Sequence, residues 1–211
     1  MADAKRDHRA FLNRYYGISR HFYDLTRKYY LFGRDAILQE LLQEDWRRLI
    51  DVGVGTGRNL RILRARRPQA EYGGIDASDE MLDHTRSRAP WAKLVHGFAE
   101  DVDLTQVFDG ERPDRILFSY CLSMVGDPVA ALRNAQRALA PGGKVVVVDF
   151  GDLEGFPGLF RVALRKWLDT FHVKPVDLAV FREVGARTRF GFGHYYVVAE
   201  LDANAPPDEA T

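Results

Sequence analysis

Short apolar segments alternate with longer amphipathic segments between residues 36 and 150, as expected for strands that alternate with helices. The strands predicted by this pattern are residues 49–52, 72–75, 93–96, 115–120 and 145–150. The predicted helices are residues 36–44, 59–66 and 129–139, with a further helix that begins after Ser78 as its N-cap. This alternation indicates an α/β fold with a central parallel sheet.

Both ends of the chain depart from that alternation. Residues 8–32 are expected to form one or two helices with a broad aromatic and aliphatic face. Near the other end, residues 187–190 and 195–200 flank a glycine-rich turn, which is typical of a hairpin. The hairpin would place one antiparallel strand in an otherwise parallel sheet.

Composition narrows the functional classes. The chain of 211 residues has 30 basic and 30 acidic side chains, and a net charge of zero argues against nucleic-acid binding by a bulk positive field. Its one cysteine, Cys121, excludes an internal disulfide framework and fits a reducing compartment. Neither a secretory signal nor a membrane-spanning apolar run is recognisable, so we expect a cytoplasmic protein.

The zero net charge conceals an asymmetry. Residues 1–34 hold eight basic and three acidic side chains, a net charge of +5, together with eight aromatic residues. The end of the chain is acidic and has few apolar residues to pack. We therefore expect a helical lid at residues 1–44, a core at residues 45–201 and a disordered tail at residues 202–211.

A glycine loop carries the strongest chemical signal. Residues 51–57 read Asp-Val-Gly-Val-Gly-Thr-Gly and lie between a predicted strand and a predicted helix, which is the context of a nucleotide-type loop. Asp76 ends the next strand, where an acid can hold a ribose diol. The glycine spacing fits neither the dinucleotide fingerprint nor a P-loop. The simpler alternative is a tight turn in an α/β domain that binds no ligand.

The loop resembles the first motif of class I methyltransferases that use S-adenosylmethionine, and the resemblance extends over residues 45–150. It implies a Rossmann-like, mostly parallel sheet of seven strands with one antiparallel strand. It implies cofactor binding by these residues: Asp51, Gly53, Gly55, Gly57, Asp76, Ala77, Met81, Phe98, Ala99, Glu100, Ser119 and Tyr120. Phe98 stands where the family usually has aspartate, so Glu100 or Asp101 would have to recognise the adenine amine.

The residues at the end of the fourth predicted strand exclude some classes of methyl acceptor. Residues 119–122 read Ser-Tyr-Cys-Leu, which matches neither the motif of enzymes that methylate exocyclic base amines nor the Pro-Cys pair of cytosine-C5 enzymes. Cys121 is expected to be a small core residue. The six histidines are scattered, so no metal site is expected.

Two further segments, residues 23–35 and 148–175, resemble bacterial N-methyltransferases of betaine-lipid synthesis when they are taken together with residues 119–124. The resemblance covers most of residues 15–198. It implies trimethylation of the amine of diacylglyceryl-homoserine, and an aminocarboxypropyl transferase as a partner. We expect Tyr23, Tyr30 and Tyr120 to line the acceptor site, and Lys28 or Arg34 to pair with the homoserine carboxylate. None of these roles follows from spacing, and helix packing would explain Tyr23 and Tyr30 equally well.

Peripheral membrane contact, at the inner face of the membrane, is also expected through residues 8–34 and 156–174. Within the second segment, Phe160, Leu164, Trp167, Leu168 and Phe171 recur at helical spacing, with basic residues beside them. From composition alone, such an aromatic stripe is more often core. Two alternatives remain: a methyltransferase acting on phosphatidylethanolamine or on a small N- or O-acceptor, and a non-catalytic, cofactor-binding partner subunit.

Overall fold

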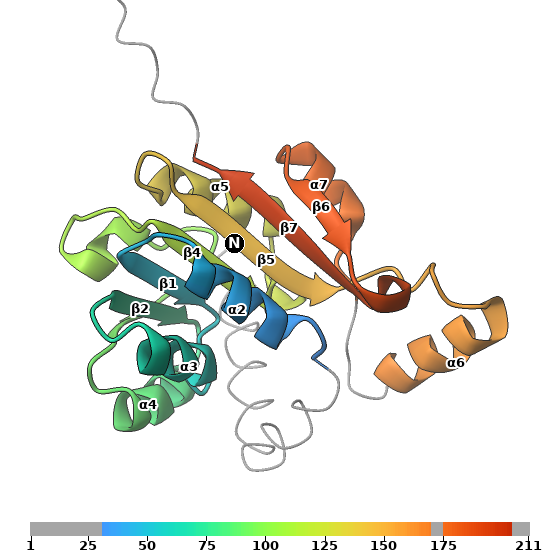
Figure 1. Cartoon of the computed structure of the whole chain (residues 1–211), viewed down its shortest axis with the longest axis horizontal. Helices are drawn as coiled ribbons and strands as arrows, with labels where there is room; N and C mark the ends of the chain where they lie inside the picture. Colours follow the sequence, from blue (N-terminus) through green and yellow to red (C-terminus); the bar gives the residue numbers. More distant parts are fainter. Residues whose placement is uncertain (1–30, 170–174, 204–211) are drawn as a thin grey trace, which may run out of the picture.

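One seven-stranded sheet organises the molecule (Figure 1). The computed structural model describes residues 31–169 and 175–203. The strand order is β3-β2-β1-β4-β5-β7-β6. The strands span Arg48–Val52 (β1), Glu71–Asp76 (β2), Lys93–His96 (β3), Arg115–Ser119 (β4), Lys144–Phe150 (β5), Arg187–Phe190 (β6) and Tyr196–Asp202 (β7).

The pairing confirms the predicted fold. Strands β1 to β5 run parallel, whereas β7 is antiparallel to both of its neighbours, β5 and β6. In β5 the apolar run Val145–Val148 is buried, as expected for a strand covered on both faces. The order reverses at β1, where β2 leaves to one side and β4 to the other, and in open α/β sheets ligands bind outside the carboxyl ends of the strands at such a point.

Helices cover both faces of the sheet. The α-helices are Arg34–Gln43 (α2), Arg58–Arg66 (α3), Asp79–Arg88 (α4), Pro128–Ala138 (α5), Gly158–Asp169 (α6) and Leu178–Glu183 (α7). Short 3₁₀ helices span Leu104–Phe108 (η1), Leu122–Met124 (η2) and Phe192–His194 (η3). Leu38 of α2 and Leu63 of α3 join one core cluster, and Leu132 of α5 and Phe181 of α7 join the other.

Local sequence signals explain where the helices begin. Ser78 accepts a hydrogen bond from the backbone N–H of Met81 at the start of α4, as predicted. Asp127 accepts one from Ala130 at the start of α5, where Pro128 occupies the first turn. The elements predicted between residues 36 and 150 match the observed bounds within two residues. The short helix α7 had no counterpart among the predictions.

Helix α2 is part of the core rather than a separate layer above it, because Ile37, Leu38 and Leu41 are buried in the cluster that also holds Leu49 of β1. The expected helices of residues 8–30 lie outside the described residues, as do residues 204–211 of the expected tail. Asp202 ends β7, and the N–H of Ala203 donates to the carbonyl of Gly143. The boundaries of the lid, at residue 44, and of the tail, at residue 202, stay predictions.

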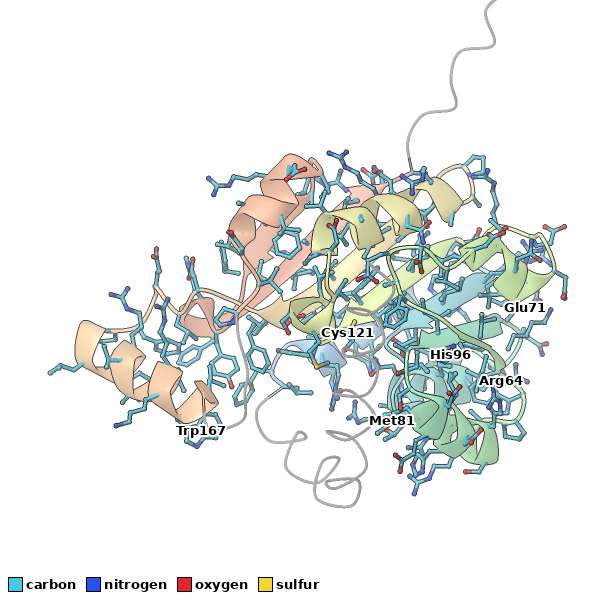
Figure 2. All side chains as sticks on the ribbon, turned by 180° about the vertical axis from the view of Figure 1, so that it is seen from behind. Arg64, Glu71, Met81, His96, Cys121 and Trp167 are labelled. Carbon is cyan, nitrogen blue, oxygen red and sulfur yellow. The ribbon has the colours of Figure 1, made fainter. Side chains whose placement is uncertain are left out.

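Helix α6 differs from the other helices in its position. It leaves the end of β5 and projects away from the body of the sheet (Figure 1), and Trp167 lies near its end, far from Met81 of α4 (Figure 2). Leu164 and Leu168 pack on the core, whereas Leu159, Val162 and Trp167 are exposed. The predicted helix is confirmed from Phe160 to Leu168, and Phe171 lies outside the described residues.

Candidate active site

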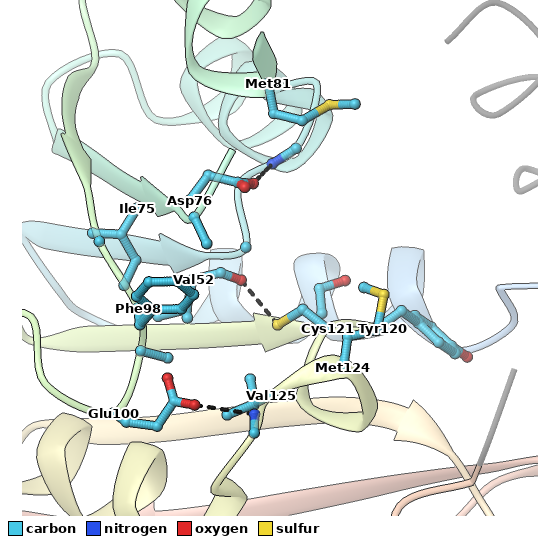
Figure 3. A pocket seen from close by; sticks show the side chains of 17 residues that line it. Val52, Ile75, Asp76, Met81, Phe98, Glu100, Tyr120, Cys121, Met124 and Val125 are labelled. Atoms are coloured by element: carbon cyan, nitrogen blue, oxygen red, sulfur yellow. Dashed lines mark hydrogen bonds between the residues drawn. The ribbon is translucent and has the colours of Figure 1, made fainter. Parts of the chain in front are cut away.

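A cavity that is open to solvent lies beyond the carboxyl ends of β1, β2 and β4 (Figure 3). Small ligands and cofactors preferentially bind at this place in open α/β sheets. The lining residues come from these strand ends and the loops after them. They are Val52, Gly53, Gly55, Ile75, Asp76, Ala77, Met81, Gly97, Phe98, Ala99, Glu100, Ser119, Tyr120, Cys121, Met124, Val125 and Gly126.

The glycine loop is packed too closely to accept side chains. Gly53 has a φ of +65°, and a Cβ atom there would lie 2.7 Å from the Cβ of Cys121. The thiol of Cys121 donates to the carbonyl of Val52 at 3.0 Å, and burial raises its pKa well above the usual value. Cys121 is thus a small packing residue, as predicted, and at the same time one wall of the cavity.

Asp76 joins the glycine loop to the end of β2. Its Oδ2 accepts a hydrogen bond from the N–H of Gly55 at 2.9 Å, and its Oδ1 accepts one from Ser78 at 2.9 Å. Burial raises the pKa of Asp76, and these backbone hydrogen bonds oppose that effect. Since a carboxylate oxygen has two lone pairs, both oxygens can accept a further hydrogen bond from a ligand.

Asp51 lies under the loop and does not line the cavity. It is 1% exposed; its Oδ1 faces the side-chain amide of Asn59 at 3.4 Å, and its Oδ2 has no hydrogen-bond partner among the described residues. Burial raises the pKa of Asp51 to about 8, while the Asn59 amide and the positive charge of Arg34 act in the opposite direction. A buried carboxylate oxygen without a donor is well suited to meet a cationic ligand group.

The loop after β3 forms the wall opposite Asp76. Phe98 and Ala99 line the cavity, as does Glu100, whose Oε1 accepts hydrogen bonds from the N–H groups of Gly126 and Asp127 at 3.0 and 3.2 Å (Figure 3). Glu100 therefore ties two loops of the cavity together. Asp101, the other expected adenine-recognising acid, is exposed and does not line the cavity.

Tyr120 closes the end of the cavity that faces the start of α2. It is buried, and its hydroxyl donates to the backbone carbonyl of Phe32. Its ring meets Phe150 edge-on at 4.7 Å. With a φ of +56°, Tyr120 has a left-handed backbone conformation that is uncommon for a tyrosine, and such strain is frequent at functional sites.

The structure brings most of the expected cofactor residues to one cavity. Gly57 is not among the lining residues; it caps α3 with a φ of +70° and lies against Thr85. Arg34 begins α2 and does not line the cavity, but its charge acts on both Asp51 and Tyr120. The expected acceptor residues Tyr23, Lys28 and Tyr30 lie outside the described residues, so their roles stay predictions.

Sequence reasoning missed several walls of the cavity. The predicted cofactor-binding residues did not include these lining residues: Val52, Ile75, Gly97, Cys121, Met124, Val125 and Gly126. Val52 and Ile75 were recognisable as the last apolar residues of strands whose carboxyl ends form the site. The loop Met124–Gly126 has no motif of its own, and the Glu100 carboxylate that holds it comes from a distant part of the chain.

Comparison with known proteins agrees with this geometry. The methyltransferase domain family matches residues 50–145 of the chain. A demethylmenaquinone methyltransferase of Deinococcus radiodurans is 30% identical over 172 residues, which cover 79% of this chain and 70% of that protein. A malonyl-[acyl-carrier protein] O-methyltransferase of Halorhodospira halophila is 33% identical over 105 residues, or 50% of this chain and 35% of that protein.

A solved structure shows the same fold. The plantazolicin methyltransferase BamL, determined with a desmethyl analogue of plantazolicin and SAH, has a TM-score of 0.64, with 97% of this chain and all of that chain aligned at 13% identity. The sheet order, the glycine loop that ends β1, the acid that ends β2 and the sequence relatives lead to one conclusion. This chain belongs to the class I S-adenosylmethionine-dependent methyltransferases.

Proposed function

We propose that this methyltransferase acts on the amine of a lipid headgroup, and that diacylglyceryl-homoserine is its acceptor. The observation that carries the proposal is the neighbourhood of Tyr120. Its hydroxyl binds the carbonyl of Phe32, whose own side chain is exposed, and Phe32 contacts Tyr195 edge-on at 5.2 Å. An acceptor that reaches the Tyr120 end of the cavity would thus pass the exposed ring of Phe32, as suits a headgroup that carries acyl chains.

The cavity fits the cofactor. The two oxygens of Asp76 suit the ribose hydroxyls. Asp51 lies beneath the glycine loop rather than in the cavity wall, and its negative charge there would attract the ammonium of the methionine part. Ile75, Met81 and Phe98 offer apolar walls to the adenine. When bound, S-adenosylmethionine supplies an electrophilic methyl group on a positively charged sulfur.

The chain's own residues would then act mainly by positioning. Methyl transfer needs the amine lone pair in line with the carbon–sulfur bond, and ideal alignment alone can lower a barrier by roughly 7–11 kcal/mol. The hydroxyl of Tyr120 is bound to Phe32, and burial raises its pKa, so Tyr120 is a positioning residue rather than the base that takes the amine proton. Its ring is also available to an ammonium product by cation–π attraction.

Arg34 is the proposed partner of an acceptor carboxylate. Its side chain is only 13% exposed. Its positive charge lowers the pKa of Asp51, on the cofactor side of the site, and the pKa of Tyr120, on the acceptor side. A guanidinium in that position suits the homoserine carboxylate, which it can bind through two parallel hydrogen bonds. Phosphatidylethanolamine has its anion, a phosphodiester, two carbons away from the amine, whereas homoserine has its carboxylate on the carbon that bears the amine. An arginine that pairs with an anion directly beside the amine would therefore favour the homoserine lipid.

A second candidate acceptor is a demethylated menaquinone, since the D. radiodurans relative that carries this activity in its name covers most of the chain. The test is to incubate the purified chain and S-adenosylmethionine with diacylglyceryl-homoserine, with phosphatidylethanolamine or with demethylmenaquinone, and to identify products by mass spectrometry. We expect the mono-, di- and trimethylated homoserine lipids. Methylated quinone, methylated phosphatidylethanolamine or no lipid product in a chain that still binds S-adenosylmethionine would contradict the proposal.

A further inference from the structure

Helix α6 has an apolar surface directed away from the protein. Its exposed apolar residues include Leu159 at 91%, Val162 at 65% and Trp167 at 43% exposure. Their spacing places Leu159 and Val162 on the side of the helix that faces away from Leu168, which is buried in the core, and Trp167 on a flank of the helix. Single exposed leucines are common on protein surfaces, but contiguous exposed apolar faces are rare. A helix that packs one apolar side on the core and exposes a second one therefore needs another apolar environment for the second side.

The apolar surface continues beyond the helix. Phe160 of α6 contacts Phe156 at 5.2 Å between ring centroids, and Phe156 contacts Phe192 of η3 at 5.4 Å. Phe192 is itself 81% exposed. Two elements distant in sequence thus contribute to one exposed surface, which we call the α6 surface (Leu159, Phe160, Val162, Trp167 and Phe192).

The charges along α6 are mostly basic. The helix has Arg161, Arg165 and Lys166 and one acidic residue, Asp169, at its last position, and Glu154 lies in the loop before it. Within residues 31–169 and 175–203, no carboxylate forms an ion pair with any of the three. Arg165 does donate to the backbone carbonyl of Asp152, which fixes its stem beside the helix.

We propose that the α6 surface docks on a bilayer that contains anionic lipid. Apolar and aromatic side chains would enter the interfacial layer, while Arg161, Arg165 and Lys166 meet the headgroups of the anionic lipids. A second copy of the chain fits less well, since pairing α6 with itself would bring these like charges together. Lys166 lies among the apolar residues, and its long stem allows its ammonium to reach the headgroups.

Docking in this way would also orient the active site. A series of contacts connects the α6 surface to the cavity. The N–H of Tyr195 donates to the carbonyl of Phe192, the ring of Tyr195 contacts Phe150 at 5.9 Å, and Phe150 contacts Tyr120 at the acceptor end of the cavity. The proposed lipid acceptor gives this docking its purpose, and to that extent the inference rests on the proposed function. Membrane binding itself can be measured without any acceptor.

The test is flotation of the full chain with vesicles of phosphatidylcholine alone or of phosphatidylcholine and phosphatidylglycerol, without acceptor, at low salt. We expect the chain to float with the anionic vesicles and to dissociate as salt rises. The double variant Leu159→Ser, Val162→Ser should partition at least about tenfold more weakly, since two inserted apolar side chains are lost. Both positions are exposed, so its melting temperature and its affinity for S-adenosylmethionine should not change.

A matched pair of charge variants distinguishes docking through α6 from a general electrostatic attraction between the basic residues of the chain and anionic lipid. Arg161→Gln with Lys166→Gln should weaken binding to the anionic vesicles, whereas Arg61→Gln with Arg66→Gln, on α3, should not. Equal binding by the Leu159→Ser, Val162→Ser variant and the unaltered chain would overturn the proposal. The proposal would also be overturned if neither protein floats with the vesicles and the unaltered chain self-associates whereas the Leu159→Ser, Val162→Ser variant does not. Floating without lipid methylation would instead contradict the proposed acceptor and leave docking intact.

Discussion

The hydroxyl of Tyr120 donates a hydrogen bond to the backbone carbonyl of Phe32, 88 residues earlier in the chain. It is the polar link between the end of β4 and the turn that leads into α2. The same turn is held from another side, because a Cβ atom at Gly33 would overlap the ring of Tyr196. The wall of the cavity and the start of α2 are therefore fixed to each other.

Tyr120→Phe should lower the turnover rate more than it changes the affinity for S-adenosylmethionine, because it frees the turn at Phe32 but leaves the glycine loop intact. The lost hydrogen bond should cost about 0.5–1.5 kcal/mol of unfolding free energy, measured by denaturant titration. Tyr72→Phe is a matched control, since the Tyr72 hydroxyl donates to the carbonyl of Arg67 away from the cavity. It should lose similar stability and keep full turnover; equal turnover in both variants would remove the role of Tyr120.

Asp76→Asn should weaken binding of S-adenosylmethionine by at least about tenfold, measured by calorimetry, since one amide oxygen cannot replace two carboxylate oxygens toward Gly55, Ser78 and a ligand diol. Asp103→Asn is the control: Asp103 caps η1 and lies at the surface. Unchanged affinity in Asp76→Asn would exclude Asp76 from the cofactor site.

Gly53→Ala should weaken cofactor binding and destabilise the fold, because the added methyl group meets the Cβ of Cys121 at 2.7 Å and the left-handed backbone is retained. Gly142→Ala measures only the destabilisation that comes from placing alanine in a left-handed backbone conformation, since Gly142 has a φ of +74° and nothing lies within 4 Å of its Cβ position. Its cost should be roughly 1–2 kcal/mol without an effect on affinity. Equal losses in the two variants would show that the close approach to Cys121 is not important.

Asp51 should make both stability and cofactor binding depend on pH. Its pKa is raised to about 8, above the unfolded value, so the folded chain retains a proton that the unfolded chain releases. Stability should therefore fall between about pH 4 and pH 8, at up to about 1.4 kcal/mol per pH unit for this group. Asp51→Asn should flatten that part of the profile, measured by thermal unfolding.

The raised pKa of Asp51 also leads us to expect that the protein releases a proton when S-adenosylmethionine binds. An ammonium beside Asp51 favours the carboxylate, so binding of S-adenosylmethionine at pH 6.5 should release close to one proton. The measurement is calorimetry in buffers of different ionisation enthalpy. In Asp51→Asn the release should disappear; if it persists, the proton comes from another group.

The sheet and the centre of the site were predictable because their signals are local. Apolar runs such as Val145–Val148, the cap at Ser78 and the glycine loop each depend on adjacent residues. The contacts of Glu100 with Gly126 and of Tyr120 with Phe32 were not predictable, since they join segments that approach only in the folded chain. Helical periodicity likewise predicted α6, but it did not show which side of the helix would be covered.

The position of α6 has an evolutionary consequence. The helix lies in the connection between β5 and α7, and in the part of the chain that the structure describes its exposed residues form no hydrogen bond to the sheet. Apart from Leu164 and Leu168, which pack on the core, its residues can therefore change without altering strand pairing or the glycine loop. Substitutions there are free to redirect the enzyme to another surface while the chemistry is retained. Exchanging this one segment between related methyltransferases is accordingly a practical way to change where such an enzyme works.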